Sequence, residues 1–212
     1  MPKNKEKEHA KKVFEILRKE YPEVKSALDF TTPFELIIAT ILSAQCTDAR
    51  VNIVTKDLFK KYRSPKDFLE VPVEELEKDI FSTGFYRNKA KSIKNCSKVL
   101  VEKYNGEVPR DFDALTELPG VGRKTASVVA ANAFGIPAIA VDTHVKRLAN
   151  LLGFIQSDDP EKIEMRLKEL LPEEEWINSS HYLISHGRKI CVARRPKCLE
   201  CVLGGICPSF NP

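Results

Sequence analysis

The side chain best placed to do chemistry in this sequence is Lys124, which follows the segment Leu118-Pro-Gly-Val-Gly-Arg. The lysine stands near the predicted start of an apolar helix, where the positive end of the helix dipole disfavours a second positive charge. Partial desolvation at such a position would favour the neutral, nucleophilic form of the amine. The pattern predicts a reactive amine or, as the alternative, a surface cation that binds a phosphate.

The turn before this lysine has the composition of a phosphate-binding hairpin. A short helix is expected over residues 113–118, and a second helix is expected to begin near Arg123. Gly120 and Gly122 would let the turn press its backbone N–H groups against a phosphate, and the start of the second helix would add further donors. Val121 would pack the turn between its two helices. An ordinary turn between helices is the alternative.

A carboxylate, Asp142, stands eighteen residues after Lys124 in the segment Val-Asp-Thr-His. It follows the apolar residues 136–141 and precedes a helix expected over residues 145–152. An amine and a carboxylate held together could attack and stabilise an electron-poor sugar carbon. The alternative role for Asp142 is that of an N-cap for the helix that follows.

Cysteines are concentrated at the C-terminal end. Four of the six lie in the last 22 residues with the spacing C-x6-C-x2-C-x5-C: Cys191, Cys198, Cys201 and Cys207. No secretory signal is recognised, so we expect a reducing compartment and metal ligation rather than disulfides. Zinc sites usually combine two short C-x2-C pairs, so the irregular spacing favours an iron–sulfur cluster, with zinc as the alternative. Cys46 and Cys96 are expected to be small buried residues.

Helical periodicity dominates the rest of the chain. Apolar residues recur with a period near 3.6 in several segments, and runs of alternating β-branched residues are lacking. Helix starts are indicated at Ser64-Pro65, Val71-Pro72 and Asp159-Pro160. Gly-Ile-Pro at residues 135–137 is expected to end a very apolar helix. The sequence predicts an all-α protein of about ten helices.

Composition and charge exclude several classes of protein. The 42% of hydrophobic residues suffice for a buried core, so most of the chain is not disordered. No apolar stretch reaches the ~18 uninterrupted residues of a membrane span, so we expect a soluble protein in the cytoplasm. Lysine and arginine exceed aspartate and glutamate by 34 to 30, and residues 188–197 are basic without an acid. This basic segment is compatible with phosphate binding.

In combination, these segments resemble the endonuclease III family of DNA repair enzymes, over about residues 10–208. The resemblance is carried by the hairpin segment ending at Lys124, by the segment around Asp142 and by the terminal cysteine pattern. Two further segments agree, namely Leu-Ser-Ala-Gln-Cys-Thr-Asp from Leu42, and Gly-Phe-Tyr from Gly84 with Asn-Lys-Ala shortly after it. Phe85 stands where the family more commonly has leucine.

The resemblance implies a two-domain, all-α helix-hairpin-helix DNA glycosylase fold with a C-terminal [4Fe-4S] cluster loop. A six-helix domain would span residues 26–136 and contain the hairpin at about residues 113–134. Residues 1–25 and 137–212 would form the second domain. The four clustered cysteines would bind the cluster in the loop of residues 191–207.

The function implied is base excision repair: removal of oxidised pyrimidines from double-stranded DNA, then strand cleavage at the abasic site by β-elimination. Lys124 would attack the sugar C1′ to form an imine, and Asp142 would stabilise the cationic sugar or accept the amine proton. Gln45 and Phe85 would fill the gap left by the extruded nucleotide and wedge the stack open, with a core aromatic as the alternative for Phe85. Further implied DNA contacts are Gly120, Val121, Gly122, Arg123, Thr125, Arg194, Arg195 and Lys197.

The resemblance implies a nucleoid-associated monomer whose partner is double-stranded DNA carrying oxidised pyrimidines or abasic sites. We expect no membrane partner. An adenine-specific or thymine-specific mismatch glycosylase of the same superfamily is one alternative, although such enzymes usually lack the lysine found here at position 124. A non-catalytic DNA-binding module is the other. It would bind duplex DNA in a salt-dependent, lesion-independent way.

Overall fold

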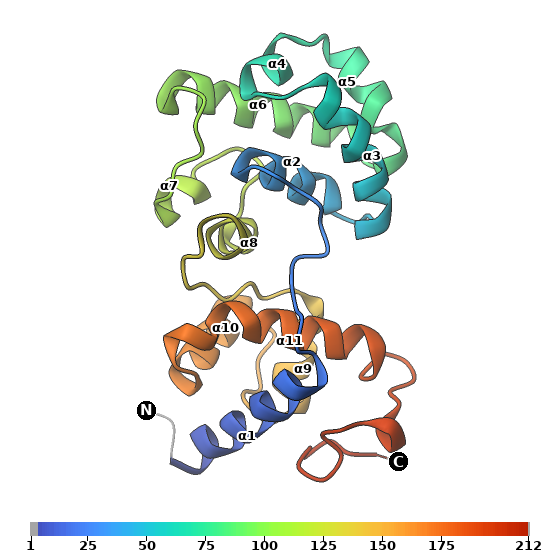
Figure 1. Ribbon diagram of the computed structural model, residues 1–212, viewed down its shortest axis with the longest axis vertical. Helices are drawn as coiled ribbons and strands as arrows, with labels where there is room; N and C mark the ends of the chain where they lie inside the picture. The colour runs from blue at the N-terminus through green and yellow to red at the C-terminus, as the bar shows by residue number, and fades with distance from the viewer. Residues whose placement is uncertain (1–3, 212) are drawn as a thin grey trace. The chain divides into compact units, whose positions relative to one another are not determined.

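The structure is a computed structural model that describes residues 4–211, and this part of the chain consists of helices and loops (Figure 1). The α-helices are α1 (Asn4–Glu20), α2 (Pro33–Ser43), α3 (Asp48–Lys61), α4 (Pro65–Glu70), α5 (Val73–Ile80), α6 (Tyr86–Tyr104), α7 (Phe112–Thr116), α8 (Arg123–Phe134), α9 (Thr143–Leu151), α10 (Pro160–Leu170) and α11 (Trp176–Lys189). Three 3-10 helices complete the set: η1 (Phe81–Thr83), η2 (Glu173–Glu175) and η3 (Cys198–Glu200). The prediction of an all-α fold is confirmed.

The chain divides into two compact units. One, called here the hairpin unit, is Ser26–Phe134, and the other, the terminal unit, joins Met1–Lys25 to Gly135–Pro212. Helix α8 ends where the sequence indicated, because Gly135 takes a left-handed φ of +66° and Pro137 follows it. The residues that position the turn and those that hold the cysteines therefore belong to separately packed cores.

Helix α2 is the central element of the hairpin unit. Leu36, Ile37 and Ile38 are fully buried in it, and the helix packs against α3, α6 and α8. A helix covered on several sides needs apolar residues around most of its circumference, which explains why its sequence lacks a polar face. A capping box between Thr32 and Glu35 fixes its first turn. The loop that follows α2 thus leaves from a buried, well-anchored helix.

The predicted helix starts are confirmed, and each has a local physical cause. Ser64 caps α4 in a capping box with Asp67, and Pro65 occupies the first turn. Asp159 accepts hydrogen bonds from the first backbone N–H groups of α10. Helix α5 begins after Pro72 without a side-chain cap, and acidic residues in its first turn favour that end of the helix dipole.

The terminal unit is a small bundle in which α1 and α9 each pack against α10 and α11. Its core draws on all four helices and includes Leu17, Leu148, Leu167 and Leu183, each at most 1% exposed. The C-terminal segment that carries the clustered cysteines packs against this core. That segment has little regular structure of its own, so the bundle supplies its support.

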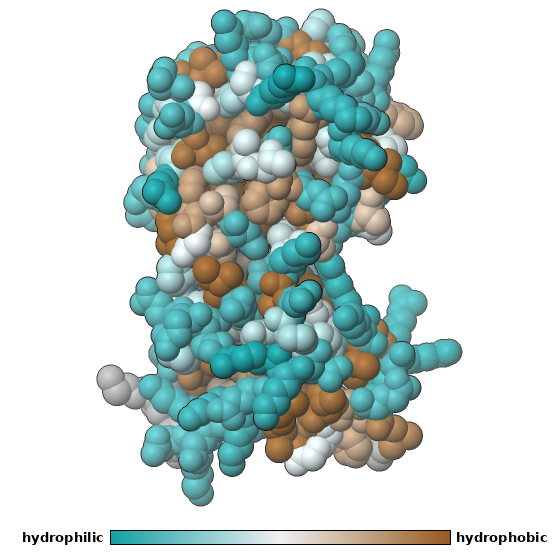
Figure 2. Space-filling model, in the orientation of Figure 1, coloured by the Kyte–Doolittle hydropathy of each residue, from teal (hydrophilic) through white to brown (hydrophobic). Residues whose placement is uncertain are grey.

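Hydrophilic side chains cover most of the face drawn in Figure 2, with smaller apolar areas between them. Among the described residues, no helix is long and apolar enough to cross a membrane. Two of the exposed large apolar residues lie close together in sequence before α6: Phe81 begins η1, and Phe85 directly precedes α6. Isolated exposed apolar residues are common, but neighbouring exposed aromatic residues next to a loop suggest a binding surface.

Candidate functional site

The hairpin between α7 and α8 is held in shape by its own residues and by α2 and α6. Gly120 has φ +81°, and a Cβ there would lie 3.0 Å from Cβ of Ser92 in α6. Val121 is 2% exposed, and its N–H donates to Leu118 O at 2.9 Å. Val121 therefore pins the turn, as the sequence predicted, and neither its side chain nor its N–H faces outward. Direct contacts to a ligand fall to its neighbours.

The first turn of α8 is an open, positively charged helix start. Gly122, Arg123 and Lys124 are exposed, and the turn contains no acidic residue. The first N–H groups of a helix have no intrahelical acceptor and lie at the positive end of its dipole. The Arg123 guanidinium lies 5.4 Å from the ring centroid of Phe112 in α7, which orients it beside the turn. This arrangement suits an anion such as a phosphate.

Lys124 itself extends from this turn into solvent. The sequence predicts a reactive amine at Lys124 from two effects, the helix dipole and partial desolvation. The structure provides the first, because Lys124 is the second residue of α8. It does not provide the second, because the side chain is exposed, so desolvation would have to come from a bound ligand.

Two loops of the hairpin unit present exposed side chains on strained backbone. Gln45, after α2, has φ +53°, and Phe85, before α6, has φ +48°. Both conformations are left-handed and disfavoured for residues with a Cβ, so the surrounding structure must maintain them. Phe85 is 62% exposed, so the alternative of a core aromatic is wrong. We call Gln45 and Phe85 the two tips.

A surface hollow of about 310 Å³ joins the tips to the hairpin. Its lining comes from α2, α6, the two tips and the hairpin, and includes Gln45, Phe85, Lys89, Gly120 and Thr125. Residues that are far apart in the sequence thus meet at one place, as the predicted DNA contacts require. Lys89 belongs to a segment that carries the family resemblance, but it is the member of this group to which the sequence analysis assigned no role.

Asp142, in the terminal unit, is the N-cap of α9. Its Oδ1 accepts hydrogen bonds from the N–H groups of His144 and Val145, both at 2.8 Å. The capping role left open by the sequence is therefore real. Both bonds use Oδ1, so Oδ2 takes no part in the cap. The half-buried carboxyl group can then combine a structural role on one oxygen with a second role on the other.

Helix α9 is joined to the cysteine segment by Arg147. Its Nη2 donates to Gly187 O at 3.0 Å and to Cys191 O at 2.7 Å. A Cβ on Gly187 would lie 3.0 Å from Nδ1 of His144, so glycine lets α11 approach α9 closely. Burial lowers the pKa of His144, partly opposed by the charge of Asp142. The helix that carries Asp142 therefore also positions the first clustered cysteine.

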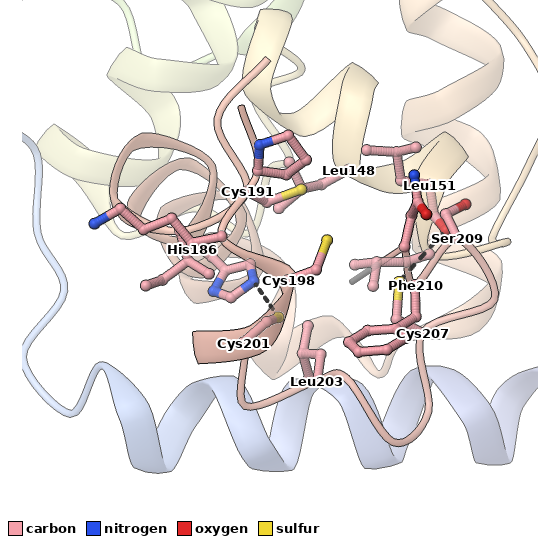
Figure 3. Close-up of a pocket in the computed structure, with 15 residues that line it drawn as sticks. Leu148, Leu151, His186, Cys191, Cys198, Cys201, Leu203, Cys207, Ser209 and Phe210 are labelled. Carbon is pink, nitrogen blue, oxygen red and sulfur yellow. Dashed lines mark hydrogen bonds between the residues drawn. The ribbon is translucent and has the colours of Figure 1, made fainter. Parts of the chain in front are cut away.

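The four clustered cysteines surround one cavity of about 90 Å³ (Figure 3). They are half-buried and come from the end of α11, from η3 and from the segment after it: Cys191, Cys198, Cys201 and Cys207. Within residues 4–211, no three His, Cys, Asp or Glu side chains are close enough to share a single metal ion. Thiols spread around a cavity fit the separate corners of a four-iron cluster.

His186 supports one of these cysteines through a hydrogen-bonded chain. Its Nε2 lies 3.4 Å from Sγ of Cys201 (Figure 3). Its Nδ1 lies 3.0 Å from the hydroxyl of Tyr21, which directly follows α1. Burial lowers the pKa of His186 to about 4, so the ring is neutral near pH 7. Burial also raises the pKa of the Cys201 thiol. The thiolate form therefore needs a nearby positive charge, such as that of an iron ion, to stabilise it. Neither His186 nor Arg147 was identified from the sequence.

The basic segment between the first two clustered cysteines lies on the surface. Arg194, Arg195 and Lys197 are all exposed, and Lys197 has a distant ion pair, 3.9 Å, with Glu200. The family resemblance implies that these side chains contact DNA phosphates, which requires that they be exposed. The N–H of Lys197 donates to Ile190 O at 3.0 Å, which ties this segment back to the end of α11.

The structure thus assembles the predicted residues in two groups. The tips and the hairpin meet in the hairpin unit, whereas Asp142 and the four cysteines belong to the terminal unit. A signal for Lys89 was present in the sequence, because residues 89, 93, 96 and 100 follow a helical period and the last three are apolar. A lysine on an apolar face is a candidate for a buried, specifically bonded charge.

Two family models match this chain. Residues 38–173 match the HhH-GPD superfamily of base excision DNA repair proteins. Residues 191–207 match the iron–sulfur binding domain of endonuclease III. The first match covers the tips, the hairpin and Asp142, and the second begins and ends on clustered cysteines.

Similar proteins agree with the family models. Endonuclease III of Bacillus subtilis (strain 168) is 53% identical over 188 residues, which are 88% of this chain and 86% of that protein. Among solved structures, a trapped covalent intermediate of endonuclease III with DNA, an estranged-adenine complex, is 50% identical and superimposes with a TM-score of 0.93 over 99% of this chain and 98% of that one. A thermostable thymine-DNA glycosylase is 27% identical, with a TM-score of 0.85 over 98% and 97% of the two chains.

Proposed function

The chain belongs to the endonuclease III family of HhH-GPD base excision DNA repair proteins, and from this premise we propose that it removes oxidised pyrimidines from double-stranded DNA. Like its family, it is a DNA glycosylase with abasic-site lyase activity. Its C-terminal loop carries a [4Fe-4S] cluster. The substrate class and the roles of individual residues are parts of this proposal.

Base removal from a duplex requires extrusion, because the sugar C1′ of a stacked, paired nucleotide is inaccessible. We assign this step to the tips. An exposed aromatic ring such as Phe85 can insert between base steps, and Gln45 can offer hydrogen bonds to the base left without a partner. The hairpin beside them would hold the backbone through the N–H groups at the start of α8. The shared hollow is the support for this assignment.

Lys124 is assigned the covalent steps. Its Nζ would attack C1′ of the extruded nucleotide, forming a C–N bond as the bond to the base breaks and the base leaves with its electron pair and a proton. The C1′–O4′ bond of the sugar ring then breaks, O4′ takes up a proton, and the adduct becomes a protonated imine of the opened sugar, which makes a 2′ hydrogen acidic. Loss of that proton forms a C2′–C3′ double bond and expels the 3′ phosphate, which cleaves the strand. Water then hydrolyses the imine and restores the amine.

Asp142 is assigned the acidic role. A carboxylate stabilises the positive charge that develops on the sugar as the base departs, and it can accept the proton that Lys124 releases on attack. The oxygen Oδ1 is held by the N–H groups of α9, which fixes the group in place. We therefore expect Oδ2 to be the atom that acts on the substrate or on the amine.

The four thiols fit the cluster, both in donor type and in their spread around one cavity. The cluster would cross-link the irregular C-terminal segment and supply positive charge that keeps the cysteines as thiolates. The residues of the loop would then present Arg194, Arg195 and Lys197 to DNA phosphates. We assign no chemical step of base removal to this part of the chain.

The main support for the proposal is the position of the exposed amine of Lys124. It stands in the first turn of α8, directly after a hairpin that lines the same hollow as both tips. A nucleophile at this position distinguishes a glycosylase with lyase activity from one that only releases the base. The test is to trap the imine. A duplex with one thymine glycol is incubated with the protein and borohydride, and a covalent protein–DNA band is sought for wild type and variants.

We expect wild type to trap and Lys124→Gln to give no band. Asp142→Asn should trap far more slowly. Lys98→Gln serves as the matched control, because Lys98 is an exposed lysine in α6 with only a 3.9 Å ion pair to Glu102. Trapping by Lys124→Gln would refute the assignment of the nucleophile. Base release by wild type without a band would instead mean that the imine mechanism does not operate.

A further inference from the structure

Lys89 is a buried lysine with two backbone partners. Its side chain is 4% exposed, and its Nζ donates to Leu42 O and to Thr83 O, each at 2.8 Å. Burial lowers its pKa from the usual range, which reflects the cost of holding an ammonium away from water. Such a group is retained where its hydrogen bonds are hard to replace.

Each carbonyl lies two or three residues before one of the two tips in the sequence. Leu42 is in the last turn of α2, three residues before Gln45, and Thr83 ends η1, two residues before Phe85. The carbonyls at a helix end lack intrahelical partners, so a cation there completes their bonding and suits the negative end of the dipole. A single ammonium thus connects the two points from which the tips depart.

The tips need such an anchor, because both have left-handed backbone. Gln45 and Phe85 have φ of +53° and +48°, and Gly84 beside Phe85 has φ +72°. Conformations of this kind persist when neighbouring contacts fix the chain on either side. Lys89 Nζ is the contact that fixes both chains with one atom, and Lys89 also lines the hollow between the tips and the hairpin.

We propose that Lys89 is a positioning residue that sets the separation of Gln45 and Phe85, so that both tips enter the DNA stack together when the nucleotide is extruded. Lys89 does not touch the reacting atoms. We expect Lys89 to affect activity only on duplex substrates, in which the base stack must be opened and the space left by the extruded nucleotide filled. This inference rests on the assignment of the tips in the proposed function and adds the residue that couples them.

The chain contains a matched control on the same helix. Lys94 of α6 also donates its ammonium to backbone carbonyls at a helix end, with Leu69 O at 3.0 Å and Phe68 O at 3.3 Å, and a third bond to Val71 O. Its partners belong to the end of α4, and it does not line the hollow. Replacing Lys94 removes the same kind of interaction without touching the tips.

The experiment compares Lys89→Met, Lys89→Arg and Lys94→Met with wild type on two substrates. One is a duplex with a central thymine glycol, followed by single-turnover base release. The other is a single-stranded oligonucleotide with an abasic site, followed by strand cleavage, where no stack has to be opened. Thermal unfolding of each variant shows that folded protein is compared at the chosen temperature.

For Lys89→Met we expect base release from the duplex to fall at least tenfold and cleavage of the single strand to stay within twofold of wild type. Lys94→Met should stay within twofold on both substrates. Lys89→Arg keeps the charge and should recover part of the duplex activity. Equal losses on the two substrates, or equal behaviour of Lys89→Met and Lys94→Met, would overturn the inference. Failure of wild type on the duplex would instead overturn the proposed function.

A double-mutant cycle separates positioning from a general effect on the fold. Once both tips are truncated in Gln45→Ala/Phe85→Ala, they have nothing left to position. Adding Lys89→Met to that background should then change duplex base release less than twofold. A further tenfold loss in the truncated background would show that Lys89 acts by another route, and the inference would be wrong.

Discussion

At the scale of single residues, Asp142 shows how one side chain can serve the fold and the chemistry at once. Its Oδ1 accepts two backbone hydrogen bonds at the start of α9, and these bonds hold the carboxyl group in place. Asparagine can cap a helix about as well as aspartate but carries no charge. The two roles can therefore be separated by substitution.

Asp142→Asn should leave stability within about 0.5 kcal/mol of wild type, while Asp142→Ala should lose about 1 kcal/mol with the cap. Both should lose most of the borohydride trapping, because neither retains the carboxylate. Urea unfolding and the trapping assay measure the two effects independently. An Asn variant that traps as fast as wild type would show that Asp142 is a cap and nothing more.

Residue types reveal chemistry from the sequence better than they reveal environment. The lysine after the hairpin and the four cysteines were evident from type and spacing. The exposure of Lys124, the left-handed backbone at Phe85 and the buried bonds of Lys89 depend on contacts between distant segments, which no local pattern encodes. Lys89 is the clearest case, because a lysine is by default assigned to the surface.

At the scale of elements, the hairpin depends on one glycine more than on the other. Gly120 combines φ +81° with a position where a Cβ would meet Ser92 at 3.0 Å, whereas a Cβ on Gly122 meets nothing within 4 Å. The two glycines stand two residues apart in the same turn, so one is a natural control for the other. Sequence alone assigned both the same role.

Gly120→Ala should destabilise the protein by about 1–3 kcal/mol, through a strained backbone and a contact in a packed region. Gly122→Ala should change stability by less than about 0.5 kcal/mol, because a Cβ there has open space. Urea unfolding of the two variants makes the comparison. Equal losses of unfolding free energy in the two variants would mean that neither the backbone conformation nor the Ser92 contact at Gly120 determines the stability of the turn.

The cysteine loop depends on two neighbouring residues, His186 of α11 and Tyr21, which directly follows α1. His186→Phe removes the ring nitrogen that lies 3.4 Å from Cys201 Sγ and deprives the Tyr21 hydroxyl of its partner. Groups that hydrogen-bond to metal ligands tune both their orientation and their hold on the metal. The loop should therefore retain its cluster less well, although all four ligands remain.

We expect His186→Phe to lose the visible absorbance of its cluster about tenfold faster than wild type in the presence of an iron chelator. His9→Phe is the control, because the His9 ring likewise makes a long-range hydrogen bond, to Leu152 O at 2.8 Å, but has no cysteine as its partner in that bond. Its rate of loss should match that of wild type. Equal rates for the two variants would refute a role for His186 in holding the cluster.

Element boundaries followed the sequence wherever a local interaction defines them. Ser64 and Asp159 cap the helices that their types predicted, and Gly135 ends α8. The short helix before the hairpin was expected over residues 113–118 and is α7, Phe112–Thr116, because Asp111 rather than Asp113 provides the N-cap. Boundaries shift by a residue or two where several acidic residues could fill the same role.

At the scale of the whole molecule, charge is unevenly distributed despite a net charge of only +4. Within the terminal unit, Arg194, Arg195 and Lys197 are exposed in the cysteine loop, while residues 173–175 are all glutamate. A small net charge gives little general attraction to DNA, so binding must come from local patches that meet phosphates. The salt dependence of binding counts such contacts.

Replacing Arg194 and Arg195 together with glutamine should weaken binding to undamaged duplex and reduce the steepness of its salt dependence. Each lost phosphate contact lowers the magnitude of the log–log slope by about 0.9, so the double variant should lose up to about 1.8. Lys11→Gln removes an exposed lysine of α1 that pairs with Glu15 at 3.9 Å, and its slope should equal that of wild type. Fluorescence anisotropy titrations over a range of salt concentrations give the slopes. Because glutamine removes the positive charge but keeps a polar side chain, an unchanged slope in the double variant would mean that the cysteine loop does not face the DNA backbone.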